Sequence, residues 1–307
     1  MNEFYLIERY FQPLSPVLLK DDAAVLSIPA GHELVVSSDT LNEGTHFIAG
    51  ADPADIAHKA LRVNLSDLAA MGADPLAYQL NIAFSAMPDE IWLEAFTAAL
   101  AADQAAFGIF CSGGDTTSIK GPLSISITAM GVVPAGQAVT RGGAEPGDVL
   151  LVSGPVGGAF CGLQALQRQP GFTVSEALIE ACYRPCPRTD LAEAVRMYAH
   201  AAVDISDGLV ADLSHICEAS GVKAVLEAET VPLSEEVKVL LRSGAVSRES
   251  LLSGGDDYQL LMAVPPQHTQ HFPGSTVIGR FEEGAGVRVQ DVDGQVLSFK
   301  EKGWTHF

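Results

Sequence analysis

Short apolar runs alternate with longer stretches of helical periodicity through the first half of the chain. The runs that predict β-strands lie at 34–37, 80–84, 109–111 and 124–131. Two helices are predicted between them, over 53–72 and 88–107. The second begins at Pro88-Asp89-Glu90 and ends before Gly108, which are typical start and stop signals. This alternation predicts an α/β or α+β fold.

A second α/β segment follows a stretch that is dense in Gly and Pro. That stretch, residues 140–148, has the composition of a crossing between domains. Beyond it, strands are predicted at 149–154 and 258–264, and a helix follows 204–208. A chain of 307 residues is long enough for two cores. We therefore expect an N-terminal domain over 1–139 and a C-terminal domain over 140–307.

Acidic residues recur at the ends of the apolar runs. In sequence order the five segments are Asp21-Asp22, Ser37-Ser38-Asp39-Thr40, Gly113-Gly114-Asp115-Thr116-Thr117, Asp204-Ile205-Ser206-Asp207-Gly208 and Gly254-Gly255-Asp256-Asp257. Carboxylates placed in this way repel one another and are costly to desolvate unless cations join them. With 38 acids against 18 bases, the chain has no surplus of Lys and Arg for that purpose. Bound metal is the simplest explanation, and hard oxygen ligands favour Mg²⁺ over zinc.

Asp67 is a further carboxylate, and it lies within the apolar stripe of the helix predicted at 53–72. Its neighbours on that stripe include Ile56, Ala60 and Val63. A charge buried there without a partner would cost several kcal/mol, which favours a metal ligand. The alternative is that Asp67 lies at the edge of the stripe in water, or pairs with Arg62.

Asp39 and Asp115 share a pattern in which an apolar strand ends in Ser or Gly and is followed by Asp-Thr. Loops at strand ends commonly hold ligands in α/β proteins, so we expect both carboxylates in such loops. Ser37, Ser38 and their carbonyls would add neutral oxygens to a metal shell. An ordinary Asp-containing turn is the alternative for each segment taken alone.

Asp204 and Asp207 lie on either side of Ser206 at the start of a predicted helix, where one of the three could be an N-cap. Asp212 and His215 follow one turn later, and we expect them to face solvent. The segment Asp256-Asp257 allows either a site or a plain turn. The Cys182–Cys186 pair has no second pair or nearby His for zinc, so ordinary reduced thiols are expected.

Charge and motifs exclude several classes of protein. A formal charge of −20 argues against nucleic acid or anionic membranes as partners. We expect a cytoplasmic protein, because the N-terminus lacks a signal-peptide layout and no apolar run approaches the roughly 20 residues of a membrane span. A phosphate-binding P-loop, a dinucleotide fingerprint, the protein-kinase motifs and a Gly-x-Ser-x-Gly elbow are all missing from the sequence. A phosphate site would thus depend on metals, glycine amides and a few bases such as Arg141.

In this order, the segments strongly resemble the thiamine-monophosphate kinases of the aminoimidazole-ribonucleotide-synthetase-like superfamily. The resemblance runs nearly end to end and includes Asp21–Val25, Ser38–Leu41 with Gly44 and His46-Phe47, Val63–Ala73, Gly113–Thr117, Arg141–Ala144 with Pro146–Asp148, Asp204–Leu209, Gly254–Tyr258, and Lys302–Trp304 with His306-Phe307. The block Asn-Leu-Ser-Asp-Leu-Ala-Ala-Met-Gly-Ala is specific to these kinases. The glycine-and-aspartate motifs alone would indicate only the superfamily.

The resemblance implies an N-terminal α/β domain whose sheet pairs with its twin in a homodimer, and a C-terminal α/β domain. ATP and thiamine monophosphate would lie in the cleft between domains and subunits. The implied ligands of several Mg²⁺ ions are Asp22, Ser37, Ser38, Asp39, Asp67, Asp115, Asp204 and Asp207, among which Asp39, Asp67, Asp115 and Asp207 are expected to be catalytic. The implied ATP contacts are Phe107, Gly114, Asp115, Arg141 and Ser206. The implied thiamine contacts are His46, Asp256 and Trp304.

Three positions depart from the family pattern. Lys20 stands where relatives often have Gly, Asp256 replaces a Glu of many relatives, and Gln259 replaces another. The shorter Asp256 side chain puts its contact with the substrate in doubt. Trp304 has a C-terminal packing role as its alternative, and His46 a structural one.

The family reaction moves the γ-phosphoryl group of ATP to the phosphate of thiamine monophosphate and gives thiamine diphosphate. A phosphate monoester has a second pKa near 6, so the acceptor needs no general base at neutral pH. We expect direct, in-line, Mg-assisted transfer without a phosphoenzyme. The alternatives are another ATP-dependent enzyme of the superfamily, or a non-catalytic acidic protein that binds metal or nucleotide.

Overall fold

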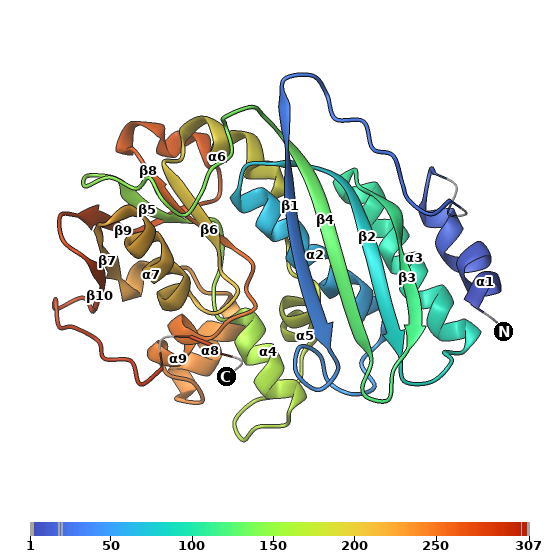
Figure 1. The fold of residues 1–307 in the computed structure, drawn as a ribbon. Coiled ribbons are helices and arrows are strands. Elements are labelled where there is room, and N and C mark those ends of the chain that lie inside the picture. Colours follow the sequence, from blue (N-terminus) through green and yellow to red (C-terminus); the bar gives the residue numbers. More distant parts are fainter. Residues whose placement is uncertain (1–2, 18, 20, 302, 306–307) are drawn as a thin grey trace. The chain divides into compact units, whose positions relative to one another are not determined.

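The chain forms two compact units in a computed structural model, which describes residues 3–17, 19, 21–301 and 303–305 (Figure 1). The first unit contains residues 1–68 and 73–136, and the second contains 69–72 and 137–307. The second unit thus begins before the predicted boundary at 140 and includes the end of an earlier helix. The reason is packing, because Ala69 and Ala70 belong to an apolar cluster with Val139 and Leu151.

The first unit is built around a four-stranded sheet in the order β1-β4-β2-β3. Its elements are α1 (Glu3–Leu6), η1 (Ile7–Phe11), η2 (Gln12–Leu14), β1 (His32–Asn42), α2 (Pro53–Ala70), β2 (Asp74–Phe84), α3 (Glu90–Phe107), β3 (Phe110–Ser118) and β4 (Ser124–Pro134). The β1–β4 and β4–β2 pairs are antiparallel, and the β2–β3 pair is parallel. The predicted helices and strands of this half are confirmed, although the strands extend further than predicted.

Local chemistry explains the limits of α3. The Asp89 side chain accepts a hydrogen bond from the backbone N–H of Trp92 at 2.7 Å and caps the helix start. Gly108 ends the helix in the left-handed conformation with φ 68°. The predicted start and stop signals are therefore the ones that the structure uses.

One face of this sheet carries the core. Along β4 every second residue is buried, including Ile125, Ile127 and Ala129, and these side chains share a face with the helices. Figure 1 shows α2 and α3 together behind one face of the sheet, and no described helix of this unit covers the other. On that other face β1 exposes Leu34 and Val36.

The second unit holds a six-stranded mixed sheet in the order β10-β7-β9-β5-β8-β6. Its elements are β5 (Val149–Val152), α4 (Gly158–Leu166), α5 (Glu176–Tyr183), η3 (Thr189–Leu191), α6 (Ala192–Tyr198), β6 (Ala201–Asp204), α7 (Leu209–Ser220), β7 (Lys223–Glu227), η4 (Ala228–Thr230), α8 (Glu235–Ser243), α9 (Arg248–Ser253), β8 (Leu260–Val264), η5 (Pro266–His271), β9 (Thr276–Glu282) and β10 (Gly286–Gln290).

The core of the second unit lies between this sheet and α7. Leu209, Leu213 and Ile216 of α7 are fully buried, as the predicted apolar stripe requires. All five residues of β8 are buried, which is typical of a central strand. Among the described residues, no helix is long and apolar enough to cross a membrane.

Candidate functional site

Asp39 and Asp67 form a carboxyl pair between β1 and α2. Asp39 lies an even number of residues from the buried Val35 and Leu41, so its side chain points to the same face, the one that the helices cover. The Ser37 hydroxyl, on the same face, donates a hydrogen bond to Oδ2 of Asp67. Three oxygen-bearing side chains that were predicted as metal ligands are thus brought together.

Asn64 attaches the edge strand to the helix beside this pair. Its Oδ1 accepts a hydrogen bond from the backbone N–H of Asp39 at 3.2 Å, and its Nδ2 donates to the Ala60 carbonyl at 3.1 Å. Because β1 is the last strand on its side of the sheet, this N–H has no neighbouring strand to bond. The helix therefore fixes both the position of Asp39 and the backbone that carries it.

Electrostatics make this pair costly without a cation. Burial raises the pKa of Asp39 to about 7, and the charge of Asp67 and a hydrogen bond with it raise that pKa too. Asp67 is half-buried within the predicted stripe. The Arg62 side chain extends to Asp103 on α3, with 2.7 Å between Nη2 and Oδ1. Two adjacent carboxylates that repel each other in this way are suited to bind a divalent cation.

The expectation that Asp39 and Asp115 lie in loops at strand ends is wrong. Both are inside strands, Asp39 in β1 and Asp115 in β3, because each segment is paired with a neighbouring strand along its length. The same pairing separates the two serines. The Ser38 hydroxyl lies 2.9 Å from the Thr128 hydroxyl on the face opposite to Asp39. The Ser38 hydroxyl therefore points away from the carboxyl pair, and only the backbone of Ser38 could contribute on that side.

Asp115 lines a cavity of about 420 Å³ in the first unit. Asp21 and Asp22 lie on its wall, together with the glycines that precede Asp115. The described residues of this wall include no Lys or Arg. A polyanionic ligand would therefore need cations to enter this cavity, since its described residues offer three carboxylates and no Lys or Arg.

Gly114 makes the backbone of this wall possible. Its φ is +150°, and a Cβ at this position would lie 1.8 Å from the Leu80 carbonyl oxygen. Only glycine lets β3 approach β2 this closely, and the register of the pair shifts nearby, between Tyr78 and Gln79. Gly114 before Asp115 is thus a packing requirement, whereas a Cβ on Gly113 would meet no atom within 4 Å.

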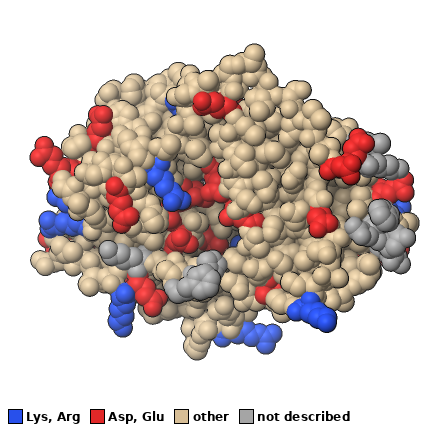
Figure 2. Space-filling view, viewed as in Figure 1, with Lys and Arg blue, Asp and Glu red and all other residues tan. Residues whose placement is uncertain are grey.

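The acids of the first unit form two separate groups. Asp39 and Asp67 lie at the β1 edge of the sheet, whereas Asp115 lies at the β3 edge with Asp21 and Asp22. Three strand-to-strand steps of about 4.8 Å separate the edges by roughly 14 Å. Within one copy of this unit, a single ion is therefore too small to bridge Asp39 and Asp115. Figure 2 shows acidic side chains at several separate places on the viewed face of the molecule.

Phe107 and His46 have contacts within the first unit that are structural. The Phe107 ring lies 5.6 Å from the Arg62 guanidinium and is not among the described residues that line the cavity. Nδ1 of His46 accepts a hydrogen bond from the Asn42 backbone N–H at 3.0 Å, which leaves the proton on Nε2. The buried Lys59 donates to the His46 carbonyl at 2.8 Å. The ATP and thiamine contacts of these two residues remain predictions.

In the second unit, the segment between β6 and α7 brings five predicted site residues together. The strand ends at the buried Asp204, and Ser206 and Asp207 follow. The Ser206 carbonyl accepts a hydrogen bond from the Asp256 N–H at 2.8 Å, and the Asp207 carbonyl accepts one from the Trp304 N–H at 2.9 Å. The predicted ATP contact Ser206 thus lies beside Asp256, and the predicted metal ligand Asp207 lies beside Trp304. Asp256 and Trp304 are the predicted thiamine contacts. Trp304 is 56% exposed. Its thiamine contact and the alternative of a C-terminal packing role both remain predictions.

The segment around Asp256 is a fixed structure with an unusual backbone. Asp256 and Tyr258 have φ of 68° and 50°, which is rare for residues with a side chain. The Tyr258 hydroxyl donates a hydrogen bond to Oδ1 of Asp256 at 3.0 Å. The buried Asp257 accepts one from the Gly157 N–H at 2.7 Å, and burial raises the pKa of Asp257 to about 7. The segment thus has a defined, hydrogen-bonded backbone, and the contact of Asp256 with thiamine remains a prediction.

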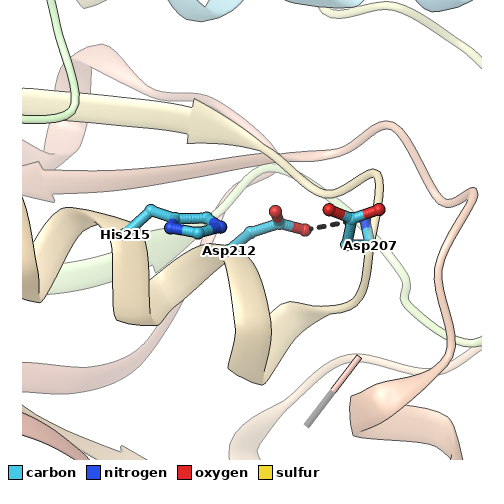
Figure 3. Close-up of side chains that lie close together, drawn as sticks. All are labelled: Asp207, Asp212 and His215. Atoms are coloured by element: carbon cyan, nitrogen blue, oxygen red, sulfur yellow. Dashed lines mark hydrogen bonds between the residues drawn. The ribbon is translucent and has the colours of Figure 1, made fainter. Parts of the chain in front are cut away.

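The expectation that Asp212 faces solvent is wrong. Asp212 is 1% exposed, and Oδ2 accepts hydrogen bonds from the backbone N–H groups of the three residues 206–208. Figure 3 shows its carboxylate between Asp207 and His215, the latter half-buried. No side chain caps α7 from the N-cap position, which is Gly208. Asp212 provides the cap instead, from inside the first turn.

Asp207, Asp212 and His215 have ligand atoms within 4.8 Å of one another. Burial raises the pKa of Asp212 to about 7 and the charge of Asp207 adds to this, whereas the three backbone hydrogen bonds oppose it. Because those N–H groups already engage Oδ2, we assign Asp212 to the support of the loop and leave Asp207 as the predicted ligand.

Arg141 belongs to a loop that Ser220 holds at the end of α7. The Ser220 hydroxyl accepts hydrogen bonds from the backbone N–H groups of Gly143 and Ala144, both at 3.1 Å. The Arg141 side chain itself is exposed. It is therefore available to a ligand, as predicted.

Comparisons with known proteins agree with this architecture. The sequence matches the AIR synthase related protein family, with its N-terminal domain over residues 20–133 and its C-terminal domain over 145–291. The chain is 41% identical to the thiamine-monophosphate kinase of Salmonella typhimurium, an alignment that covers 100% of this chain and 98% of that protein. This chain belongs to the thiamine-monophosphate kinase family.

Solved structures support the same family. The crystal structure of thiamine-monophosphate kinase from Stenotrophomonas maltophilia K279a is similar at a TM-score of 0.85 and 40% identity, covering 97% of this chain and 98% of that one. The structure of AaThiL complexed with AMPPCP and TMP has a TM-score of 0.82 and 34% identity, covering 99% and 97%. The family resemblance and the two-domain α/β fold predicted from the sequence are confirmed.

The structure places four residues beside the predicted site that were not predicted from the sequence. They are Asn64, Asp212, Asp257 and Tyr258. A signal was available for two of them. Asn64 precedes Asp67 by three positions and so shares its helix face, and Asp212 lies in the first turn of a helix whose N-cap is glycine. The roles of Asp257 and Tyr258 depend on loop geometry, which no local pattern predicts.

Proposed function

We propose that this protein transfers the γ-phosphoryl group of ATP directly to the phosphate of thiamine monophosphate, giving thiamine diphosphate and ADP. The observation that carries the proposal is the full-length match to thiamine-monophosphate kinases, together with the loop contacts that join Ser206 and Asp207 to Asp256 and Trp304. Because these contacts put predicted nucleotide and thiamine residues on one backbone framework, a single reaction that uses both substrates is supported.

The acceptor needs little activation. Its phosphate is already largely ionised at neutral pH, because the second pKa of a phosphate monoester is about 6. The main barrier is the approach of two polyanions, since two unit charges 4 Å apart repel by about 4 kcal/mol at an effective dielectric constant of 20. Positioning and charge compensation therefore carry the catalysis.

The donor sets of this chain fit Mg²⁺. Asp39, Asp67 and Ser37 offer oxygens at the β1 edge, Asp22 and Asp115 offer them around the cavity, and Asp204 and Asp207 offer them in the second unit. The raised pKa of Asp39 and the lack of Lys or Arg among the described residues of the cavity wall both favour added cations. When bound, Mg²⁺ would neutralise phosphate oxygens and align them for in-line transfer.

The protein groups have separate tasks in this proposal. Arg141 and Ser206 hold the nucleotide, and the backbone at Gly114 and Asp115 lets its phosphates approach the cavity wall. Asp256 and Trp304 hold the thiamine end, with Trp304 stacking on a ring. The Tyr258 hydroxyl fixes the carboxylate of Asp256, and this support compensates for a side chain shorter than the Glu of many relatives.

We further propose that the protein is a homodimer whose first-unit sheets pair. β1 presents Leu34 and Val36 on the uncovered face, 41% and 54% exposed, and apolar residues at this density favour a protein partner. A second copy would also bring a second set of edge carboxylates. Within one copy, the β1 edge with Asp39 and the β3 edge with Asp115 are roughly 14 Å apart. Analytical ultracentrifugation tests this part, and a monomer at assay concentration would reject it.

The decisive experiment is product analysis. Purified protein is incubated with ATP and thiamine monophosphate, with Mg²⁺ or with EDTA, and thiamine diphosphate is measured by chromatography. We expect product and ADP in equal amounts with Mg²⁺ and neither with EDTA. ATP consumption without thiamine diphosphate would indicate another ATP-dependent enzyme of the superfamily, and binding without turnover a non-catalytic protein. A labelled protein after brief exposure to γ-labelled ATP would contradict direct transfer.

A further inference from the structure

The buried carboxylate of Asp212 controls the backbone of the loop that carries Ser206 and Asp207. One oxygen, Oδ2, accepts hydrogen bonds from three consecutive backbone N–H groups, those of Ser206 at 3.0 Å, Asp207 at 3.1 Å and Gly208 at 3.1 Å. Three N–H groups that converge in this way form an anion-binding concavity. Here the anion is a side chain of the protein itself, so the loop has its shape before any ligand arrives.

Among the described residues, only Asp212 accepts hydrogen bonds from all three of these N–H groups. They belong to the start of α7, where backbone donors have no partner within the helix. Gly208, at the N-cap, has no side chain to offer. Without the Asp212 carboxylate, three buried or half-buried N–H donors would lose the acceptor that the described residues provide, and unpaired buried donors are costly.

The opposite side of the loop is closely packed against residues 253–255. A Cβ on Gly208 would lie 2.5 Å from the Ser253 carbonyl oxygen, and one on Gly255 would lie 2.2 Å from the Ser206 carbonyl oxygen. The carbonyls of Ser206 and Asp207 accept the N–H groups of Asp256 and Trp304. A shift in the loop would therefore move predicted groups of both the nucleotide side and the thiamine side.

We propose that Asp212 is a positioning residue that holds residues 206–208 in the ligand-ready conformation and so links the metal ligand Asp207 to the thiamine contacts Asp256 and Trp304. This inference rests on the proposed function for its kinetic consequences. Its structural part is independent of activity. In this proposal Asp212 acts through the backbone, because its Oδ2 accepts the three N–H groups of residues 206–208.

The test compares Asp212→Asn and Asp212→Ala with a control, Glu218→Gln, which changes an exposed acid of the same helix. Hydrogen exchange of the amides of Ser206, Asp207 and Gly208 is followed by NMR in the ligand-free full-length protein. We expect exchange at these amides to accelerate at least tenfold in Asp212→Asn, while amides of β8 keep their wild-type rates. Asp212→Ala should accelerate them more, and Glu218→Gln should change nothing.

Kinetics form the second arm. In Asp212→Asn, the Mg²⁺ concentration for half-maximal rate and the KM for thiamine monophosphate should both rise about tenfold. Unchanged exchange at 206–208, acceleration spread evenly over the whole unit, or faster local exchange with wild-type kinetics would each overturn the proposal. If the wild-type protein forms no thiamine diphosphate, the proposed function fails, and the exchange experiment still decides whether Asp212 holds the loop.

Discussion

The carboxyl groups of Asp39 and Asp67 share a hydrogen bond between an edge strand and a helix. Two carboxyl groups in such contact need a proton or a cation between them, because the doubly ionised state is strongly disfavoured. The pKa of Asp39, raised to about 7 by burial and by Asp67, is the signature of that requirement in the free protein. A proton and a divalent cation are therefore alternatives at the same position.

The first prediction concerns stability against pH. The folded-state pKa of Asp39 lies above its usual 3.8, so the unfolded chain releases this proton first as pH rises. In EDTA the free energy of unfolding should therefore fall between about pH 4 and pH 7 and then level off. Mg²⁺ competes with the proton, so it should raise Tm more at pH 8 than at pH 5, by at least roughly 3 °C. Thermal unfolding with and without Mg²⁺ measures both effects.

Two variants isolate the contribution of Asp39, because Asp212 and Asp257 also have raised pKa values. Asp39→Asn should flatten part of the fall in EDTA and reduce the Mg²⁺ effect at pH 8. Glu94→Gln, at an exposed position of α3, should behave like the wild type. A Mg²⁺ effect of equal size at both pH values would contradict the prediction.

Substitution of Gly114 should damage the cavity wall. In Gly114→Ala, the new Cβ would need to move from 1.8 Å to an ordinary distance from the Leu80 oxygen, and φ of +150° strains any residue with a side chain. We expect a loss of about 3 kcal/mol or more in the free energy of unfolding and a rise in the KM for ATP. Urea titration and steady-state kinetics measure the two quantities.

Gly121→Ala is the matched control, because its Cβ would lie 3.9 Å from the Ile119 side chain, an ordinary contact. This variant should keep the stability and the KM of the wild type. Wild-type behaviour of Gly114→Ala itself would mean that β3 does not need glycine at this position.

Tyr258→Phe should weaken the binding of thiamine monophosphate. The variant removes only the hydroxyl that donates to Asp256 at 3.0 Å. A hydrogen bond to a charged group contributes about 1.5 kcal/mol, which corresponds to a rise of about tenfold in the KM for thiamine monophosphate. The KM for ATP should stay within about twofold. Tyr198→Phe, whose ring stacks on His271, serves as the control, and an equal effect in both variants would reject the role of Tyr258.

Asp103→Asn should destabilise the first unit without touching its site. The buried Asp103 pairs with Arg62 and His58 and so joins α3 to α2. Burial alone would raise its pKa, but the hydrogen bonds from His58 and Arg62 outweigh burial and lower it. Since breaking a buried pair costs about 3–5 kcal/mol, we expect a loss of that order at pH 7.

The pH dependence of the stabilisation by Asp103 gives a second test. A lowered pKa means that the stabilisation is present above the usual value of 3.8 and is lost as pH falls below it. The stabilities of wild type and variant should therefore converge in strong acid. Equal urea midpoints at pH 7 would show that the pair contributes nothing.

Periodicity and helix signals predicted the elements well, because they depend on local chemistry. Asp89 and Gly108 mark the ends of α3, and Leu209, Leu213 and Ile216 mark the buried face of α7. The family motifs also located the acids. Their placement in strands was missed, because Ser-Ser-Asp and Gly-Gly-Asp have turn-like composition while pairing with neighbouring strands decides the conformation.

Strand order and hydrogen bonds to the backbone decide two further features of the site. Strand order puts β1 and β3 at opposite edges, so Asp39 and Asp115 are far apart although their motifs are alike. Asp is a residue type that is mostly exposed, yet Asp212 is buried because three backbone donors converge on it. The strand order has no signature in a short window of sequence, whereas the local sign of the Asp212 contacts is its place in the first turn after a glycine N-cap.

Divalent-cation binding by the Asp39–Asp67 pair is the central claim, and its most direct test is a count of bound ions. Mn²⁺ binding in place of Mg²⁺ is measured by electron paramagnetic resonance, with AMPPCP and thiamine monophosphate present, for wild type, Asp39→Asn and Asp67→Asn. We expect each variant to lose at least one tightly bound ion and about 100-fold or more of the thiamine diphosphate formation rate. Wild-type numbers and affinities of bound Mn²⁺ in both variants would contradict the account.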